Sequence, residues 1–214
     1  SPDAGFYIGQ CYPCDAIVNN VISENNGLGY SGTNSGGSLY IISSVFRNNK
    51  GGLAPNTLDS ELLPPERETF IIGNLIENNN NDDAPATKST YLSFGNGVII
   101  AGGNNNIIKN NVIANHDLYG VILTAAADVN YWPAHGNRVE DNLILSSNRA
   151  DLAISGVSNL GNCFKGNYFN TSIPPGLQSL NNCDSGFIPL SSDLSGMWSS
   201  LARVIHASDG GYQQ

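Results

Sequence analysis

A short pattern of apolar residues around a central asparagine, or once a serine, recurs six times along the chain, and it restricts the fold more than any other feature of the sequence. In one copy, the runs Ile107-Ile108 and Val112-Ile113 enclose Asn110 and Asn111. The residues equivalent to Asn111 are Asn20, Ser44, Asn74, Asn142 and Asn167. Neighbouring copies are separated by 24 residues (Asn20 to Ser44) to 37 residues (Asn74 to Asn111). A repeat of this length indicates units stacked in one direction.

The residues around each central position predict strands that meet at a tight corner. Every copy carries an apolar residue three positions before the centre, namely Ile17, Ile41, Ile71, Ile108, Val139 and Phe164. Every copy carries another two positions after it, namely Ile22, Phe46, Ile76, Ile113, Ile144 and Phe169. Asn, Gly, Ser and Asp separate the two columns, and these residues favour turns and interrupt helices. We therefore expect coils of about three short strands, with the central amides stacked in a hydrogen-bonded ladder.

The pattern Asn-x-Ile-x-x-Asn, followed by Gly and an apolar residue, resembles that of the right-handed parallel β-helix repeat proteins over about residues 5–171. The resemblance implies an all-β solenoid of about six coils with long loop insertions. The same repeat occurs in pectate and alginate lyases, in mannuronan epimerases, in the periplasmic accessory protein of nitrous-oxide reductase and in many surface proteins. Since one fold supports many functions, the site must be argued separately.

The sequence also indicates how the chain is divided into domains and which classes of partner its charge and hydropathy disfavour. We expect a β-helix over residues 1–187 and a C-terminal capping segment over 188–214, in which Ser192-Asp193 starts a short amphipathic helix that reaches about Ile205. The net charge of −9 argues against nucleic acid as a partner. The sequence contains no apolar run long enough to span a bilayer and no signal-peptide pattern at its start.

The four cysteines predict structural disulfides and an extracytoplasmic location. Cys163 lies in the last copy of the repeat and Cys183 just beyond it, so a bond between them would fasten the following segment to the end of the array. Cys11 and Cys14 would close a small local loop. A redox role for Cys11-Tyr12-Pro13-Cys14 is the weaker alternative, because a thioredoxin-like motif requires a βαβ setting.

A second set of strands follows the pattern Gly-apolar and includes Gly97-Val98-Ile99-Ile100 and Gly120-Val121-Ile122-Leu123. Alternation directs one set of side chains inward: Phe6, Ile8, Val98, Ile100, Val121, Leu123, Leu152 and Ile154. It directs Tyr7, Ile99, Ile122 and Ala153 outward. An apolar outer face indicates that loops or a partner cover it.

Three insertions account for most of the extra length between repeats: Ala54 to Glu68, Asn80 to Asn96, and Ala125 to His135. The first and third leave the array at the same corner and the second at the preceding corner, so all three should flank the apolar outer face. Loops that project from a rigid scaffold often carry binding or catalytic residues. Alternatively, these loops only cover the apolar strands.

The start of the array carries no capping segment, since Ser1 to Ala4 is too short to cover the first coil. Open parallel edges pair readily with further strands, and natural solenoids cap them. We expect either that N-terminal coils precede this sequence or that another protein chain covers the edge.

Candidate catalytic residues lie in Asn115-His116-Asp117-Leu118-Tyr119-Gly120 and in the following insertion. His116, Tyr119 and His135 could exchange protons with a uronic acid, as such groups do in the epimerases and lyases of this fold. Tyr131 and Trp132 could stack on sugar rings and Arg67 could bind substrate. The Asp-Pro-His-Asp motif of mannuronan epimerases is absent. A turn required by the repeat is the favoured explanation of His116, Asp117 and Tyr119, since Asn25 to Gly29 occupies the same position in an earlier copy.

Acidic residues of two insertions offer a possible calcium site. The first insertion contains Asp59, Glu61, Glu66 and Glu68, and the second contains Asp82 and Asp83. Carboxylates from the two loops, Asp59 and Glu61 with Asp82 and Asp83, could converge on Ca²⁺. Solvation of these charges is the alternative, and Arg67 could instead neutralise its acidic neighbours. Asn170-Thr171-Ser172 fits an N-glycosylation acceptor.

Three functions are consistent with the sequence. The first is an extracytoplasmic structural or interaction module, part of a larger protein or assembly. The second is a domain that binds or modifies an acidic polysaccharide. The third is a periplasmic accessory protein of a metalloenzyme, which only the family resemblance suggests.

Overall fold

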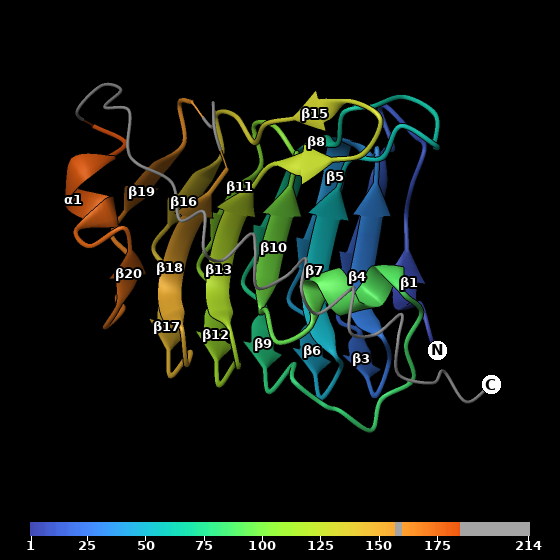
Figure 1. Cartoon of the computed structure of the whole chain (residues 1–214), viewed down its shortest axis with the longest axis horizontal. Coiled ribbons are helices and arrows are strands. Elements are labelled where there is room, and N and C mark those ends of the chain that lie inside the picture. Colours follow the sequence, from blue (N-terminus) through green and yellow to red (C-terminus); the bar gives the residue numbers. More distant parts are fainter. Residues whose placement is uncertain (157–159, 185–214) are drawn as a thin grey trace.

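The computed structural model describes residues 1–156 and 160–184, and it confirms the predicted parallel β-helix (Figure 1). Each of the first five coils contributes one strand to each of three parallel sheets, and the last residues add strands to the first and second sheets only. The short apolar runs of the repeat form the strands, and the small polar residues between them form the corners, where Asn20, Gly73 and Asn110 have positive φ.

The first sheet contains seven strands: β1 (Ala4–Tyr7), β4 (Leu28–Thr33), β7 (Gly51–Asn56), β10 (Val98–Ala101), β13 (Tyr119–Thr124), β18 (Ala150–Ser155) and β20 (Ser172–Ile173). The second contains six: β2 (Ala16–Asn19), β5 (Gly36–Ile42), β8 (Arg67–Ile72), β11 (Ile107–Lys109), β16 (Arg138–Glu140) and β19 (Cys163–Lys165). The third contains five: β3 (Ile22–Glu24), β6 (Val45–Arg47), β9 (Leu75–Glu77), β12 (Val112–Ala114) and β17 (Leu143–Leu145).

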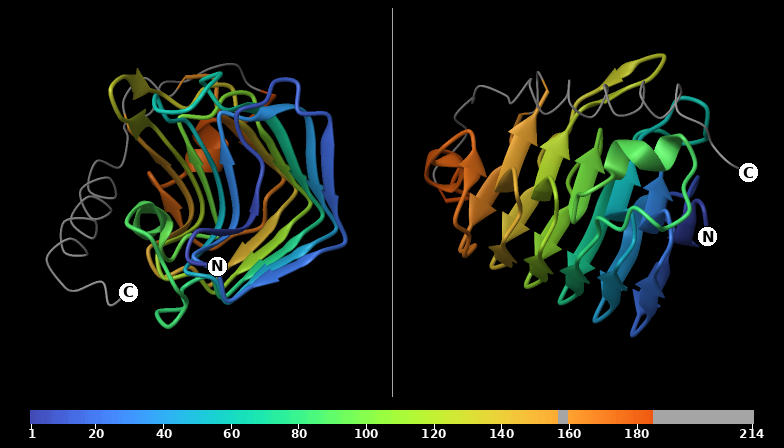
Figure 2. Two further views of the ribbon diagram at one scale, coloured as in Figure 1. Left: turned by 90° about the vertical axis from the view of Figure 1, so that its right-hand side faces the viewer. Right: turned by 60° about the horizontal axis from the view of Figure 1, so that its bottom comes forward.

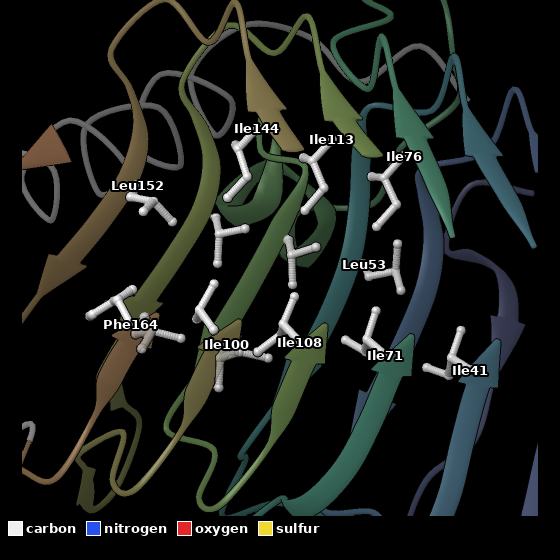
Figure 3. Packing of buried hydrophobic residues seen from close by; sticks show 14 of the residues in the cluster. Ile41, Leu53, Ile71, Ile76, Ile100, Ile108, Ile113, Ile144, Leu152 and Phe164 are labelled. Atoms are coloured by element: carbon white, nitrogen blue, oxygen red, sulfur yellow. The ribbon is translucent and has the colours of Figure 1, made fainter. Parts of the chain in front are cut away.

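The inward-facing side chains of the three sheets form one continuous core. Figure 3 shows Ile41, Ile71 and Ile108 side by side in one row, facing a second row of Ile76, Ile113 and Ile144. The predicted inward positions of the first sheet, from Val98 to Ile154, belong to this core, with Phe6 and Ile8 packed against its end. Stacked β-branched side chains at the strand spacing exclude water along the whole array.

The predicted amide ladder lies at the corner between the second and third sheets. Asn111 donates from Nδ2 to Oδ1 of Asn142 (2.9 Å) and accepts at Oδ1 from the backbone N–H of Asn74 (2.9 Å). The same pattern runs from Ser44 to Asn167, and Gln178 accepts from Asn167 at its end. These amides satisfy the backbone groups that each corner would otherwise bury without partners.

In the first copy of the repeat, the predicted alignment with the other copies is wrong by one residue. Val18, and not Ile17, pairs with Ile41 and faces the core, so Val21 takes the ladder position predicted for Asn20. The N–H of Val21 donates to the Ser44 hydroxyl (3.2 Å). Ile17 and Ile22 consequently face outward. Asn20, which matched the sequence pattern, is instead the turn residue with positive φ that precedes the ladder position.

The three insertions leave the coils where the sequence predicts. Residues 57–66 connect β7 to β8, and residues 125–137 connect β13 to β16 and contain a hairpin of β14 (Ala126–Ala127) and β15 (Tyr131–Trp132). The second insertion connects β9 to β10 at the other edge of the first sheet, and its 3-10 helix η1 (Ser89–Ser93) packs against β7. Both views of Figure 2 show this helix and the hairpin on the side of the first sheet.

The C-terminal end of the core is covered. The short helix α1 (Leu177–Leu180), which the sequence did not predict, buries Leu177 completely and contacts β19. The predicted disulfide between Cys163 and Cys183 joins β19 to the segment after this helix, and the second predicted disulfide joins Cys11 to Cys14. The expected helix at 192–205 and the domain boundary near residue 187 lie outside the described residues.

In the parts of the chain that the structure describes, no helix has the length and apolar character needed to cross a membrane.

Candidate functional site

The first and third insertions meet at one carboxylate, although they leave coils that are not neighbours. Asp59 accepts at Oδ2 from the backbone N–H of Asn130 (2.7 Å) and at Oδ1 from its side-chain amide (2.7 Å). The N–H of Asp59 donates in turn to Asp128 (2.9 Å). The hydrogen bonds from Asn130 hold the pKa of Asp59 below its ordinary value. Together the two insertions form a continuous rim along the corner between the first and second sheets.

Trp132 belongs to this rim. Its indole Nε1 donates to Oδ1 of Asp59 (3.1 Å), so the ring is held in one orientation while it remains half-buried. Tyr131 is the preceding residue of β15, and its side chain is exposed. The predicted sugar-stacking residues therefore lie together at the edge of the first sheet.

The first insertion is also fastened to the first coil by tyrosine–carboxylate pairs. Tyr7 donates to Glu61 (2.5 Å), and Tyr12 donates to Glu68 (2.8 Å). The guanidinium of Arg67 lies 3.7 Å from the centroid of the Tyr12 ring, and its Nη1 donates to the carbonyl of Pro65. Arg67 was predicted to bind substrate. In the structure its guanidinium instead binds a carbonyl of the insertion and stacks on the Tyr12 ring.

A buried acid lies beneath the same insertion. Glu66 is completely buried and accepts from the Thr69 hydroxyl and from Nδ2 of Asn106, both at 2.8 Å. Burial raises the pKa of Glu66 to about 8, although the nearby charge of Arg67 opposes the shift. Asn106, Asn137 and Asn162 form a second amide ladder. The side-chain amides of Asn137 and Asn162 donate to backbone carbonyls, whereas that of Asn106 donates to Glu66, so the Glu66 carboxyl takes the place of a carbonyl.

His116 occupies a third ladder, at the corner between the third and first sheets. In earlier coils this position holds Asn49 and Asn79, and Asn49 donates to Asn79 (2.9 Å). The N–H of Asn79 donates to Nδ1 of His116 (3.4 Å), and the imidazole Nε2 lies 3.3 Å from the carbonyl of Ile76. A ring that accepts at Nδ1 carries its proton on Nε2.

The surroundings of His116 suit a structural imidazole. The residue is 1% exposed, and burial lowers its pKa to about 4, so the ring is neutral at physiological pH. Nothing in this geometry gives the imidazole access to a substrate. The turn that the repeat requires therefore explains His116 directly.

The other two predicted catalytic residues lie apart from His116. Tyr119 begins β13, is 1% exposed, and accepts from Nε of Arg149 (2.5 Å). His135 lies at the end of the third insertion, where its Nδ1 accepts from the backbone N–H of Leu160 (3.2 Å). The three residues serve three different positions in the coil, so the structure does not assemble them into one acid–base group.

The acidic residues predicted to bind calcium are divided between two corners. Asp59 and Glu61 lie in the rim, where both already accept hydrogen bonds, whereas Asp82 and Asp83 lie exposed in the second insertion. The Asp82 carbonyl accepts from Lys50, whose Nζ lies 5.5 Å from the centroid of Tyr91. Among the described residues, no group of three or more His, Cys, Asp or Glu side chains could hold a metal ion.

The outer face of the first sheet carries a second, smaller apolar cluster. Ile99, Ile122, Ala153 and Ile173 form one row across adjacent strands. Ile122 and Ala153 are buried, with Leu118, Tyr119 and Ala150 in the same cluster. The predicted outward orientation is confirmed for this row, and η1 lies on the same face over β7.

Comparison with known proteins agrees with this architecture. The structure matches the A-module of the mannuronan C-5 epimerase AlgE4 of Azotobacter vinelandii with a TM-score of 0.54 and 16% sequence identity. The match covers 79% of this chain and 53% of that module. This chain shares the fold of that module. At this identity the likeness concerns the fold alone, and the chain spans about half the length of the module.

Sequence comparisons add no function to the fold. A scan against protein-family models found no match, and a search of curated proteins found none either.

Proposed function

We propose that this chain is an extracytoplasmic β-helix module that joins another polypeptide through the edge of its first coil. The difference between the two ends of the core supports this most directly. Leu177, Gln178 and the Cys163–Cys183 disulfide cover the last coil. Within the described residues, β1, β2 and β3 have strand partners on one side only.

The core side chains of the first coil support the same proposal. Phe6, Ile8 and Val21 pack against the core but remain half-buried, and Val21 places no amide in the ladder. A further coil would bury these side chains and pair the free strand edges, as neighbouring coils do throughout a solenoid. The two disulfides are typical of proteins that fold in an oxidising, extracytoplasmic compartment.

Site-specific photo-cross-linking tests this function. A photoreactive amino acid at Val21, on the open edge, should capture a polypeptide when the protein is isolated gently from its native source. The same group at Val129, which is 84% exposed on the hairpin, serves as the matched control and should capture none. A monomer that yields no cross-link from Val21 would remove the proposal.

A second candidate is binding or modification of an acidic polysaccharide. It is supported by the rim, where Asp59 holds Trp132 beside the first sheet, and by the fold shared with an epimerase module. Calorimetry with alginate and polygalacturonate, together with absorbance of unsaturated products, would test it. Binding should weaken in Trp132→Ala and His135→Ala variants, and indifference to all acidic glycans would exclude it. The role as accessory protein of a metalloenzyme stays a prediction from the sequence.

A further inference from the structure

The corner between the second and third sheets is two residues long in every coil. The pairs are Asn20-Val21, Ser43-Ser44, Gly73-Asn74, Asn110-Asn111, Asp141-Asn142 and Gly166-Asn167. All three long insertions lie at the other two corners. Within residues 1–156 and 160–184, the outer faces of these two sheets are therefore level and carry no long loop at the corner that joins them (Figure 2).

An apolar column runs along the third sheet beside this corner. Strand pairing aligns Ile22, Val45, Leu75, Val112 and Leu143, and an isolated bridge adds Tyr168. Ile22 is 62% exposed and Val112 is 42% exposed. Val45 and Leu75 between them are half-buried. A continuous apolar column of this kind is unusual on a protein surface in water.

The second sheet adds aromatic and aliphatic side chains to the same surface. Tyr40 and Phe70 stack with their ring centroids 4.8 Å apart, between Ile17 and Ile107 in the neighbouring coils. Ile42 and Ile72 form the next column, and both are half-buried. Both sheets contribute apolar side chains only in the first four coils, around the Tyr40–Phe70 pair, whereas Leu143 and Tyr168 continue the third-sheet column alone in the fifth and sixth.

The charges on this surface are nearly balanced, and Glu77, which pairs in register with Arg47, adds one acidic side chain beyond the ion pairs. Arg47 pairs with Glu24, Lys109 with Glu140 and Asp141, Arg138 with Glu140, and Lys165 with Asp184. The chain as a whole carries a net charge of −9. A second copy can therefore approach this surface without the repulsion that the remaining acidic surface would cause.

We propose that the level surface formed by the second and third sheets is a self-association site for a second copy of this chain. A two-fold axis through the Tyr40–Phe70 pair would place the first coil of one copy against the fourth coil of the other. Ten apolar residues would then be covered on each copy: Ile17, Ile22, Tyr40, Ile42, Val45, Phe70, Ile72, Leu75, Ile107 and Val112. The charged fifth and sixth coils would stay in water.

The size of the surface predicts a weak dimer. Stable interfaces typically use about 20–30 residues on each partner, and this surface offers fewer apolar ones. Dimerisation should therefore depend on protein concentration, and the near balance of charge on the surface should make the dimer insensitive to moderate salt. Such a dimer leaves the open edge of the first coil accessible at the end of the stack.

Analytical ultracentrifugation over a wide concentration range tests the proposal. The unsubstituted chain should shift from monomer to dimer, and Phe70→Glu should raise the dissociation constant roughly tenfold or more. Phe70→Leu should keep the dimer, and Val129→Glu, an equal change on the hairpin, should leave it unaffected. Circular dichroism would confirm that each variant is folded.

Two results would overturn the proposal. One is a chain that stays monomeric at every concentration, including a monomer that instead binds vesicles or glycans through Phe70. The other is equal weakening by Phe70→Glu and Val129→Glu. Cross-linking from Val21 reports on the edge of the first coil and should be unchanged in Phe70→Glu, so failure of the dimer and failure of the proposed edge function are distinguishable.

Discussion

The indole Nε1 of Trp132 donates a hydrogen bond to Asp59, a residue 73 positions earlier in an insertion from a different coil. The same carboxylate binds the backbone and the side chain of Asn130. One acidic side chain therefore determines the position of the aromatic hairpin relative to the rest of the rim.

Replacing Asp59 with Ala should release the hairpin without unfolding the core. Amide hydrogen exchange across residues 125–135 should accelerate, because the N–H of Asn130 loses its acceptor, while the melting temperature should change little. In the unsubstituted protein, the same release should occur as the pH falls through the lowered pKa of Asp59. Asp82→Ala, in the second insertion, is the control, and equal exchange in both variants would contradict the role of Asp59.

Replacing Asn111 with Leu should destabilise the protein by about 2–3 kcal/mol, because two buried backbone groups of the preceding coil lose their partners. The donors and acceptors concerned are the Ile71 carbonyl and the Asn74 N–H. Denaturant unfolding would measure the loss. Asn170→Leu changes an exposed residue and should be nearly neutral. A similar effect of both substitutions would mean that the ladder adds no stability of its own.

His116→Asn should preserve stability at neutral pH, since asparagine occupies this ladder position in the two preceding coils. His116→Ala should destabilise the fold. With a folded pKa near 4, the buried imidazole must stay neutral, so the unsubstituted protein should lose stability as the pH falls from about 6.5 towards 4. Thermal unfolding against pH would show this dependence weakened in His116→Asn. Loss of a glycan-modifying activity in a His116→Asn protein of unchanged stability would favour catalysis instead.

Glu66→Gln should stabilise the protein most strongly at alkaline pH. The folded pKa of about 8 lies above the ordinary value of 4.5, so unfolding releases a proton and stability falls between these values by up to ~1.4 kcal/mol per pH unit. Glutamine preserves the shape and removes this ionisation. Urea midpoints at pH 5, 7 and 9 should separate the two proteins progressively. Parallel curves for both proteins would show that Glu66 ionises freely in the fold.

Removing the Cys163–Cys183 disulfide should cost more stability than removing Cys11–Cys14. The first bond joins residues 20 apart and the second residues 3 apart. Loop-closure entropy then gives about 3 and about 2 kcal/mol respectively. Paired Cys→Ser variants compared by denaturant unfolding would measure the difference. A larger loss of stability on removing Cys11–Cys14 would indicate that the first coil depends on its disulfide more than the last coil depends on Cys163–Cys183.

The sequence predicted the features that recur and missed those that occur once. The ladder through Asn74, Asn111, Asn142 and Asn167 was predictable because each corner has the same orphan backbone groups and the same side chain satisfies them. The error at Asn20 arose because a turn residue and a ladder residue are chemically alike, and the inward position of Val18 alone distinguishes them.

The rim could not be derived in the same way. Contacts such as Asp59 with Asn130 depend on the conformation of two irregular insertions, which no periodicity constrains. Glu66 was placed among solvated loop charges, whereas the structure buries it completely. Its signal was its place just before β8, where the chain re-enters the coil and its side chain turns inward.

The constant two-residue corner makes the coils interchangeable units. Leu75 and Val112 hold the same register position, and so do the ladder amides before them. Deleting residues 75–111 would join Asn74 directly to Val112 at equivalent geometry and shorten the stack by one coil. Whole coils could thus be added to or removed from the stack without redesign of the chain on either side.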